Sequence, residues 1–472
     1  MIRRLSTLAV AAVTLTIAMA PAHGAEKWDA APWLADVEVM HQAFATKYAN
    51  RMWLEEQRAI PVDALFAFLS RQIESAGSDA EARAILDRVM RQIGDGHVTI
   101  DWDRADHAAA SPAPASAPKD AESLCRSIGF ANRHGSRGVA AALRGYKPLG
   151  QKGLLAAGTV ERNGTRLGVI RIPVFEAEAF PETCEAAVAA QRVLLDRPCD
   201  DDCQGEIVGA AYAALTADLE DRLRALRAAG ATTLLVDITD NGGGSEWAEA
   251  VARTLTPKRL RSERHGFVRG PHWAKIWGDL AARLRGWAKT AGPDDRAKLA
   301  AWATQADAAQ HIAQTSCDPR TGCEWLGKAG YATGLVGDAG PDDIDGPWEA
   351  YIFSPGQHPY HEGVWDGPVI VLVDQETWSA AEEFAALLQD NQAATIVGAR
   401  TGGAGCGHTW GGTPTRLERI GATLELPDCV RFRADGSNEV SGVIPDTLIG
   451  WRANDSTALK LRLLEQALDS QR

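Results

Sequence analysis

The chain has 472 residues and a formal net charge of −13, with 45% hydrophobic and 24% charged residues. This composition is typical of a soluble globular protein with two or three domains. The acidic balance and the lack of a basic stretch argue against nucleic acid as a partner.

Residues 1–24 are typical of a cleaved signal peptide. A basic start with two arginines is followed by an apolar run over residues 5–20 and by the small-residue cleavage site Ala22-His23-Gly24. We therefore expect a periplasmic or secreted mature chain that begins near Ala25. An uncleaved anchor is the alternative, although the apolar run is short for a membrane span. No later segment predicts stable membrane insertion.

The eight cysteines agree with an oxidising compartment. Close spacing favours the local disulfides Cys199–Cys203 and Cys317–Cys323. The remaining four cysteines then form Cys406–Cys429 and Cys125–Cys184, although sequence alone leaves other pairings open. A zinc site is the weaker interpretation because no two cysteines have C-x-x-C spacing.

Helical periodicity predicts an N-terminal helical domain over residues 25–95. It ends in Gly94-Asp95-Gly96-His97, where two glycines stop the last helix and a strand begins. His97 is therefore expected on a tight loop, where a histidine is either simply exposed or available for chemistry. Residues 96–160 include an Ala/Pro/Ser-rich stretch and predict a linker with a small irregular region.

Residues 161–255 predict the first part of an α/β core. Strands are expected over 167–175 and 232–238, with a long helix over 208–229 between them. A glycine-rich loop follows the second strand, and the next helix begins at Glu246. This strand–loop–helix unit builds parallel or mixed sheets. The loop lacks the nucleotide-binding glycine patterns.

Residues 256–350 predict a helical, tryptophan-rich insertion, mostly helical over 273–314. We interpret its tryptophans chiefly as the core of a packed subdomain, with a lid or substrate-binding wall as the alternative. His358 and His361 have metal-pair spacing, but nothing else in the sequence supports a metal site. We therefore predict no metal and no other cofactor.

Residues 351–472 predict the second part of the core. An apolar strand over 369–373 is followed by a turn and a helix over 380–389, with Ser379 at the helix N-cap. The structural interpretation is a capping box between Ser379 and Glu382. The catalytic interpretation is a nucleophile beside free backbone N–H groups that hold an oxyanion.

Four separated motifs occur in order on predicted loops and β/α joints: G-D-G-H (94–97), D-I-T-D-N-G-G-G (237–244), S-A-A-E (379–382) and N-E-V-S-G-V-I-P-D (438–446). Together they resemble the tail-specific (C-terminal processing) serine peptidase superfamily, over roughly residues 30–450. Members with a serine–lysine dyad carry the lysine in a G-K-G loop, but Gly403-Ala404-Gly405 has alanine there. The chain is more similar to the PDZ-less branch, which includes the tricorn core and a chlamydial secreted protease.

The resemblance implies an α/β (α+β) fold, with a mixed-sheet, ClpP/crotonase-like serine peptidase core. It implies a Ser379, His97 and Glu439 triad, and an oxyanion hole formed by the amides of Ala380 and of Gly243 or Gly244. In this scheme His97 removes the serine proton, while Glu439 holds the imidazole tautomer and stabilises the imidazolium.

The sequence thus predicts an exported serine endopeptidase that acts on a peptide or protein substrate through an acyl-enzyme. The alternative is a non-catalytic lipophile- or peptide-binding protein on the same scaffold. A metal-dependent hydrolase using the two spaced histidines is a third interpretation, and chelators would inhibit it. Substrate specificity and oligomeric state stay open.

Overall fold

The computed structural model describes residues 28–102, 118–133, 138–150, 152–191, 198–315, 317, 323–341 and 343–470. The predicted signal peptide lies outside these residues, as does most of the Ala/Pro/Ser-rich stretch. In the part of the chain that the structure describes, no helix is both long enough and apolar enough to cross a membrane.

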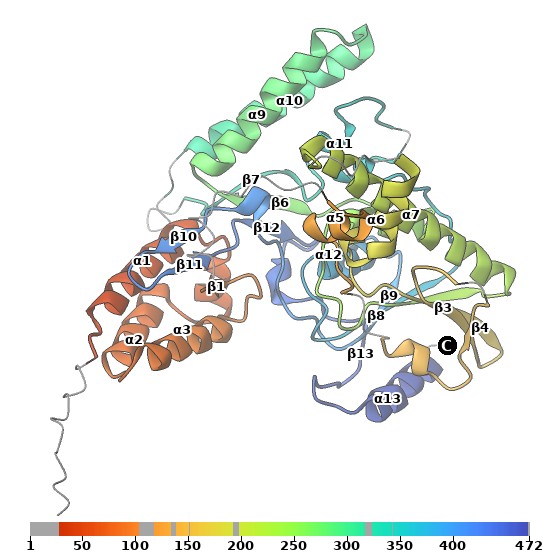
Figure 1. Ribbon diagram of the computed structural model, residues 1–472, viewed down its shortest axis with the longest axis horizontal. Coiled ribbons are helices and arrows are strands. Elements are labelled where there is room, and N and C mark those ends of the chain that lie inside the picture. Colours follow the sequence, from red (N-terminus) through yellow and green to blue (C-terminus); the bar gives the residue numbers. More distant parts are fainter. Residues whose placement is uncertain are drawn as a thin grey trace, which may run out of the picture.

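An N-terminal group of helices forms one end of the molecule (Figure 1). It comprises α1 (Ala31–Lys47), the π-helical turn η1 (Trp53–Gln57), α2 (Val62–Glu74) and α3 (Asp79–Ile93). Gly94 ends α3 with a φ of 80°, a left-handed conformation that glycine adopts readily.

A small antiparallel sheet from both ends of the chain completes this helical domain. Its strands are β1 (Thr99–Asp101), β11 (Ala422–Glu425) and β10 (Thr415–Leu417), in the order β1-β11-β10. Leu417 and Leu424 are buried in the same hydrophobic cluster as Phe44 and Leu86. This shared core brings the loop that carries His97 close to residues that follow Ser379 in the chain.

The central sheet has seven strands in the order β13-β9-β8-β5-β4-β3-β2. Their bounds are β2 (Lys147–Pro148), β3 (Ala157–Arg162), β4 (Thr165–Arg171), β5 (Thr233–Asp237), β8 (Val369–Val373), β9 (Thr395–Gly398) and β13 (Thr447–Leu448). The strands from β13 to β4 run parallel, and β3 and β2 are antiparallel to their neighbours. The predicted mixed sheet is confirmed.

Helices cover both faces of this sheet. One core contains residues of α5 (Ala121–Ser127), α6 (Pro181–Gln191), α7 (Asp201–Ala228), α8 (Trp247–Thr254) and α12 (Ala380–Asp390). The core on the other face contains residues of α13 (Thr457–Ser470). Short helical turns are η2 (Ala140–Ala142), η3 (Ala177–Ala179), α11 (Glu349–Ile352), η5 (Ser354–Gln357), η6 (Thr409–Gly411) and η7 (Glu439–Ser441).

A third sheet has the antiparallel order β12-β6-β7, with β6 (Arg264–Val268), β7 (Leu326–Tyr331) and β12 (Cys429–Phe432). Between β6 and β7 the chain forms a long hairpin of α9 (Pro271–Ala288) and α10 (Pro293–Gln314), which extends from the body in Figure 1. The two helices agree with the prediction for 273–314, whereas β6 and β7 have no counterpart among the predicted elements. Trp273 and Trp277 are buried.

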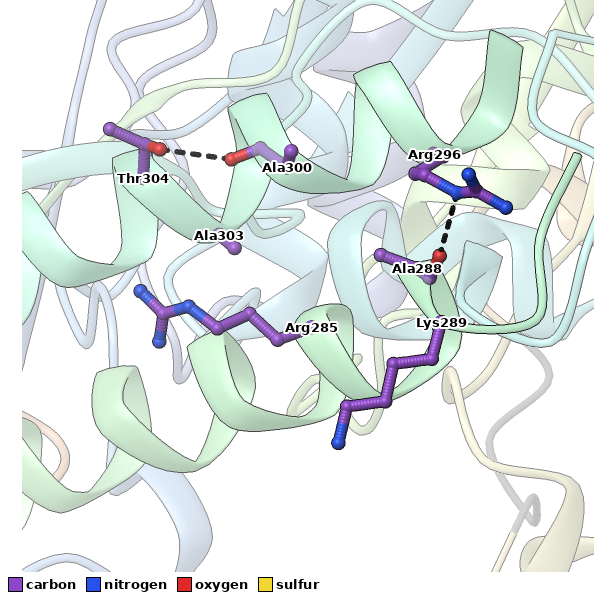
Figure 2. A pocket seen from close by; sticks show the side chains of 7 residues that line it. All are labelled: Arg285, Ala288, Lys289, Arg296, Ala300, Ala303 and Thr304. Carbon is purple, nitrogen blue, oxygen red and sulfur yellow. Dashed lines mark hydrogen bonds between the residues drawn. The ribbon is translucent and has the colours of Figure 1, made fainter. Parts of the chain in front are cut away.

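A hollow of about 590 Å³ lies between α9 and α10 (Figure 2). Its lining residues are Arg285, Ala288, Lys289, Arg296, Ala300, Ala303 and Thr304. The Thr304 hydroxyl donates to the Ala300 carbonyl at 2.9 Å, and Arg296 Nε donates to the Ala288 carbonyl at 3.2 Å. None of the predicted site residues lines this hollow.

Four disulfides join the eight cysteines: Cys125–Cys184, Cys199–Cys203, Cys317–Cys323 and Cys406–Cys429. The favoured pairing is thus confirmed. The Cys406–Cys429 bond ties the loop after β9 to β12, and so connects the central sheet to the third sheet.

Candidate active site

Ser379 stands at the joint between β8 and α12. All five residues of β8 are buried, which fixes the end of this strand within the central sheet. The backbone at Ser379 has a φ of 55°, in a region that non-glycine residues rarely occupy. Strained conformations of this kind persist where the surrounding structure fixes them, and they are frequent at active sites. The serine is therefore held at a sharp turn at the positive end of the helix dipole.

The glycine loop after β5 packs directly against this turn. A Cβ atom at Gly243, whose φ is 103°, would lie 2.8 Å from the Ser379 Cβ and 2.9 Å from the Ala380 nitrogen. Only glycine permits this approach. The Gly243 N–H donates to Asn241 Oδ1 at 2.9 Å, so this amide already has an acceptor. Within the described residues, the amides of Ala380 and Gly244 have no acceptor.

Glu382 links the serine turn to the loop that follows β9. It is fully buried and forms the glutamate half of the predicted capping box, because the Ser379 N–H donates to Glu382 Oε2 at 3.1 Å. The Glu382 N–H donates to the Ser379 main-chain carbonyl at 2.9 Å. The carboxylate also accepts from the Thr401 hydroxyl at 2.6 Å and from the N–H groups of Gly403, Ala404 and Gly405 at 2.8, 2.7 and 3.3 Å. Burial raises the pKa of Glu382 to about 6, and these donors oppose the shift.

His97 lies on the loop between α3 and β1, and its backbone is held by Asp95. Asp95 Oδ1 accepts from the His97 N–H at 3.0 Å. Asp95 Oδ2 accepts from the Tyr48 hydroxyl at 2.9 Å and from the Asn50 side chain at 2.8 Å. Burial raises the pKa of Asp95 to about 6, while these donors favour its charged form. The G-D-G-H motif is thus a fixed turn anchored on the helical domain.

The His97 ring is oriented by a main-chain carbonyl. Its Nδ1 lies 2.9 Å from the Ala404 oxygen. A carbonyl can only accept, so Nδ1 carries the proton and Nε2 keeps a free lone pair. Burial has the largest effect on the pKa of His97 and lowers it, and the charge of Arg431 also lowers it. The hydrogen bond to Ala404 and the charge of Glu439 act in the opposite direction and raise this pKa. The described residues show no hydrogen bond between this ring and Ser379.

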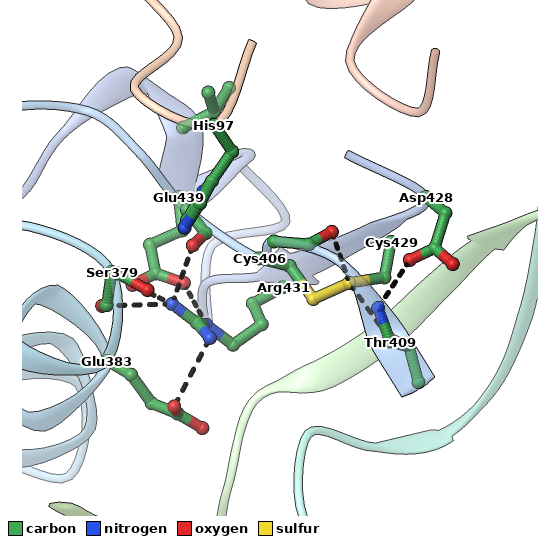
Figure 3. The surroundings of a disulfide bond; sticks show 12 residues. His97, Ser379, Glu383, Cys406, Thr409, Asp428, Cys429, Arg431 and Glu439 are labelled. Carbon is green, nitrogen blue, oxygen red and sulfur yellow. Dashed lines mark hydrogen bonds and ion pairs between the residues drawn. A yellow bond between two sulfur atoms is a disulfide. The ribbon is translucent and has the colours of Figure 1, made fainter. Parts of the chain in front are cut away.

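Arg431, on β12, connects the nucleophile turn to Glu439 (Figure 3). Its Nε and Nη2 both donate to the Glu439 carboxylate, the second at 3.1 Å. Nη2 also donates to the carbonyl oxygens of Ser379 at 3.1 Å and Gly405 at 3.0 Å. Nη1 lies 3.2 Å from Glu383 Oε2. One guanidinium group therefore holds four parts of the site.

The structure brings Ser379, His97 and Glu439 into one cluster around Arg431. In Figure 3 the His97 side chain extends toward the group formed by the other three residues. Both Glu439 oxygens accept from Arg431, whereas the His97 Nδ1 is bonded to Ala404. Glu439 was predicted to hold the imidazole tautomer of His97, but in the structure the carbonyl oxygen of Ala404 holds it.

Two further buried acids, Glu263 and Glu383, lie beside Arg431. Burial raises the pKa of Glu383 to about 8, and the Arg431 charge opposes the shift. Burial also raises the pKa of Glu263, and the charge of Glu439 raises it further. The raised pKa values favour the protonated forms of Glu383 and Glu263. Both oxygens of Glu439 accept hydrogen bonds from Arg431.

Sequence reasoning missed Arg431 and the second function of Glu382. A signal for Arg431 exists, since one cation interrupts the otherwise apolar strand Cys429-Val430-Arg431-Phe432. A charge in a buried strand requires a partner of opposite charge. No side-chain signal identifies Ala404, because its contribution to the site is a backbone oxygen.

The spaced histidines of the third interpretation have separate surroundings. His361 Nδ1 lies 2.8 Å from Glu220 Oε1. His358 is buried against Tyr212, with ring centroids 4.8 Å apart. Among the described residues, three potential metal-ligand atoms come together only at His265, Cys406 and Cys429, and the two cysteines form a disulfide.

Comparisons with known proteins identify the family of the chain. A family model described as peptidase family S41 matches residues 166–449, more than half of the chain. The chain belongs to peptidase family S41. This membership implies a serine peptidase, which acts on peptides or proteins, and it confirms the resemblance to the tail-specific superfamily. No curated protein matches the sequence significantly.

Solved structures share the fold. Mature CPAF is 14% identical, with 93% of this chain and 96% of that chain covered and a TM-score of 0.57. Mature CPAF complexed with lactacystin is 15% identical, with 93% and 98% covered and a TM-score of 0.56. At this identity the likeness is one of fold, and it extends over nearly the whole S41 chain.

Proposed function

We propose that this S41 peptidase is an exported endopeptidase with Ser379 as nucleophile, His97 as base and Glu439 as the acidic member of the triad. The observation that carries the proposal is that Arg431 binds both the strained serine turn and Glu439, beside a histidine whose Nε2 is free to accept a proton. Its disulfides and the predicted signal peptide support export.

In the proposed reaction, Ser379 Oγ attacks the carbonyl carbon of the peptide bond while His97 Nε2 takes the hydroxyl proton. The tetrahedral oxyanion is held by the amides of Ala380 and Gly244, each worth roughly 3 kcal/mol. The Gly243 N–H can donate to the oxyanion only if its hydrogen bond to Asn241 Oδ1 breaks. The C–N bond then breaks, and the proton passes from His97 to the leaving amine. Water hydrolyses the acyl-enzyme by the same steps.

Glu439 acts on His97 through its charge in this proposal. Its negative charge favours the imidazolium that forms during attack, while Arg431 opposes it. The Ala404 carbonyl fixes the tautomer. Glu382 is a positioning residue, because it fixes both the Ser379 amide and the Ala404 segment.

Digestion of an unfolded protein tests this function. Product fragments identified by mass spectrometry should show cleavage at internal bonds, and Ser379→Ala and His97→Ala should each abolish it. Ser70→Ala is a matched control, since this hydroxyl on α2 donates only to the Phe66 carbonyl. Release of terminal residues alone would contradict the endopeptidase assignment. Cleavage that survives Ser379→Ala would contradict the nucleophile.

The binding-protein alternative keeps one specific observation in its favour. Glu439 is paired with Arg431, and the described residues show no hydrogen bond from the His97 ring to Ser379. A well-folded chain that cleaves no protein but binds apolar peptides or lipids would support this alternative.

A further inference from the structure

A cavity of about 400 Å³ lies between the helical domain and the peptidase core. The helical domain contributes Trp53, Gln57, Arg58 and Gly94, and the core contributes Arg400, Thr401, Gly402, Gly403, Val440 and Ser441. None of these ten lining residues is acidic, and two are arginines.

Arg58 is an exposed arginine that lies beside Trp53 and has few acceptors. Its guanidinium carbon lies 5.6 Å from the centre of the Trp53 ring. Its Nη2 donates to the Gln92 carbonyl at 3.3 Å. A Cβ on Gly94 would lie 2.9 Å from Nη1, so glycine leaves the space that the guanidinium group occupies. Within the described ranges, no carboxylate forms an ion pair with Arg58.

Arg400 faces the same cavity from the core. Its Nε and Nη2 both donate to the Ser441 carbonyl, the first at 2.7 Å. It too has no ion-pair partner among the residues that the structure describes. A guanidinium group has five N–H donors, so both arginines keep donors that no group among the described residues accepts.

We propose that this cavity is an anion-binding site, in which Arg58 and Arg400 together hold a small carboxylate or phosphate group. Guanidinium groups match the planar or tetrahedral oxygens of such anions and form charge-assisted hydrogen bonds with them. The lining supplies two cations, both exposed, and no acidic competitor.

The cavity lies next to the segments that carry the proposed catalytic residues, so a bound anion would contact those segments. Gly94 precedes His97 by three residues, Gly403 is next to Ala404, and Val440 follows Glu439. A bound anion bridges the helical domain that carries the base and the core loops that carry the other groups. It therefore adds a contact that holds the two domains together.

The anion has two chemical sources, a free anion or the C-terminal carboxylate of a peptide. Binding needs neither Ser379 nor turnover, so the site stands apart from the proposed catalytic function. Titration calorimetry with inorganic phosphate, against sodium chloride of equal ionic strength, measures it directly. Parallel titrations use a pentapeptide with a free C-terminus and the same peptide amidated, on the Ser379→Ala variant to prevent cleavage.

We expect saturable phosphate binding that Arg400→Gln and Arg58→Gln each weaken by about tenfold, the loss of one charge-assisted contact. Arg88→Gln is the matched control, since Arg88 is an exposed arginine of the same domain outside the cavity. A peptide that binds only with its free C-terminus identifies the peptide as the source; phosphate alone identifies a free anion.

Absence of binding beyond the chloride control, for phosphate and for both peptides, would overturn the proposal. So would undiminished binding in the folded Arg58→Gln/Arg400→Gln double variant. Thermal unfolding of each variant shows whether it is folded. Retained binding with no proteolysis would separate this site from the proposed function, because the calorimetric signal does not depend on catalysis.

Discussion

Arg431→Met removes the cation at the centre of the site and keeps an apolar side chain of similar length. Glu439, which is 1% exposed, then loses the partner of both its carboxylate oxygens. Removing one member of a buried ion pair costs roughly 3–5 kcal/mol.

We expect the free energy of unfolding to fall by about 3 kcal/mol in this variant. Urea unfolding followed by tryptophan fluorescence measures it. The double variant Arg431→Met/Glu439→Gln should recover most of the loss, because no unpaired charge stays buried. Arg416→Met is the control: its ion pair with Glu418 spans 3.1 Å, the two side chains are 49% and 71% exposed, and we expect a change below about 1 kcal/mol.

Two results would refute this reasoning. One is a loss in Arg431→Met no larger than in the exposed control. The other is a double variant that is no more stable than the single one, because the unpaired charge would then not be the cause.

Three further predictions concern reaction with a fluorophosphonate, which measures the nucleophile directly. The pKa of His97 is lowered, so its imidazole stays neutral as the pH falls through 6.5. The labelling rate should therefore fall to half of its maximum at a pH below 6.5. A midpoint above pH 7 would contradict this. Gly243→Ala should abolish labelling of folded protein, since the new methyl group lies 2.8 Å from the Ser379 Cβ, whereas Gly242→Ala, with nothing within 4 Å, should leave it unchanged. In Glu382→Gln, an amide N–H group replaces a carboxylate oxygen that accepts hydrogen bonds, among five donors. We expect labelling, measured by time-resolved gel fluorescence, to slow by about tenfold to a hundredfold. An unchanged rate would show that Glu382 is not a positioning residue.

The local elements around Ser379 follow closely from the sequence. The apolar run 369–373 is β8, and the predicted helix 380–389 is α12, one residue longer. β-Branched residues favour a buried strand, and Ala, Leu and Glu favour a helix. Four ordered motifs were enough to predict the family, because each carries residue types that a specific local geometry requires.

The elements that sequence did not predict depend on partners far away in the chain. β6 is short, and its neighbour β12 comes from residues 429–432. The short strands β2 and β3 lie in a stretch without clear periodicity. A strand of this kind is defined by cross-strand pairing more than by its own residues.

The same reason limits the prediction of the site. The residue types of Ser379, His97 and Glu439 suggest their chemistry, but their contacts arise only on folding. The bond from the His97 ring to Ala404 spans 307 residues of sequence. The pairing of Glu439 with Arg431 depends on how β12 faces η7, which no local pattern encodes.

The most direct test of the central claim is to label the mature protein with a fluorophosphonate and locate the adduct by peptide mass mapping. We expect a single adduct on the peptide that contains Ser379, absent from Ser379→Ala and from His97→Ala and retained in Ser70→Ala. An adduct on another serine, or labelling that persists in Ser379→Ala, would contradict it.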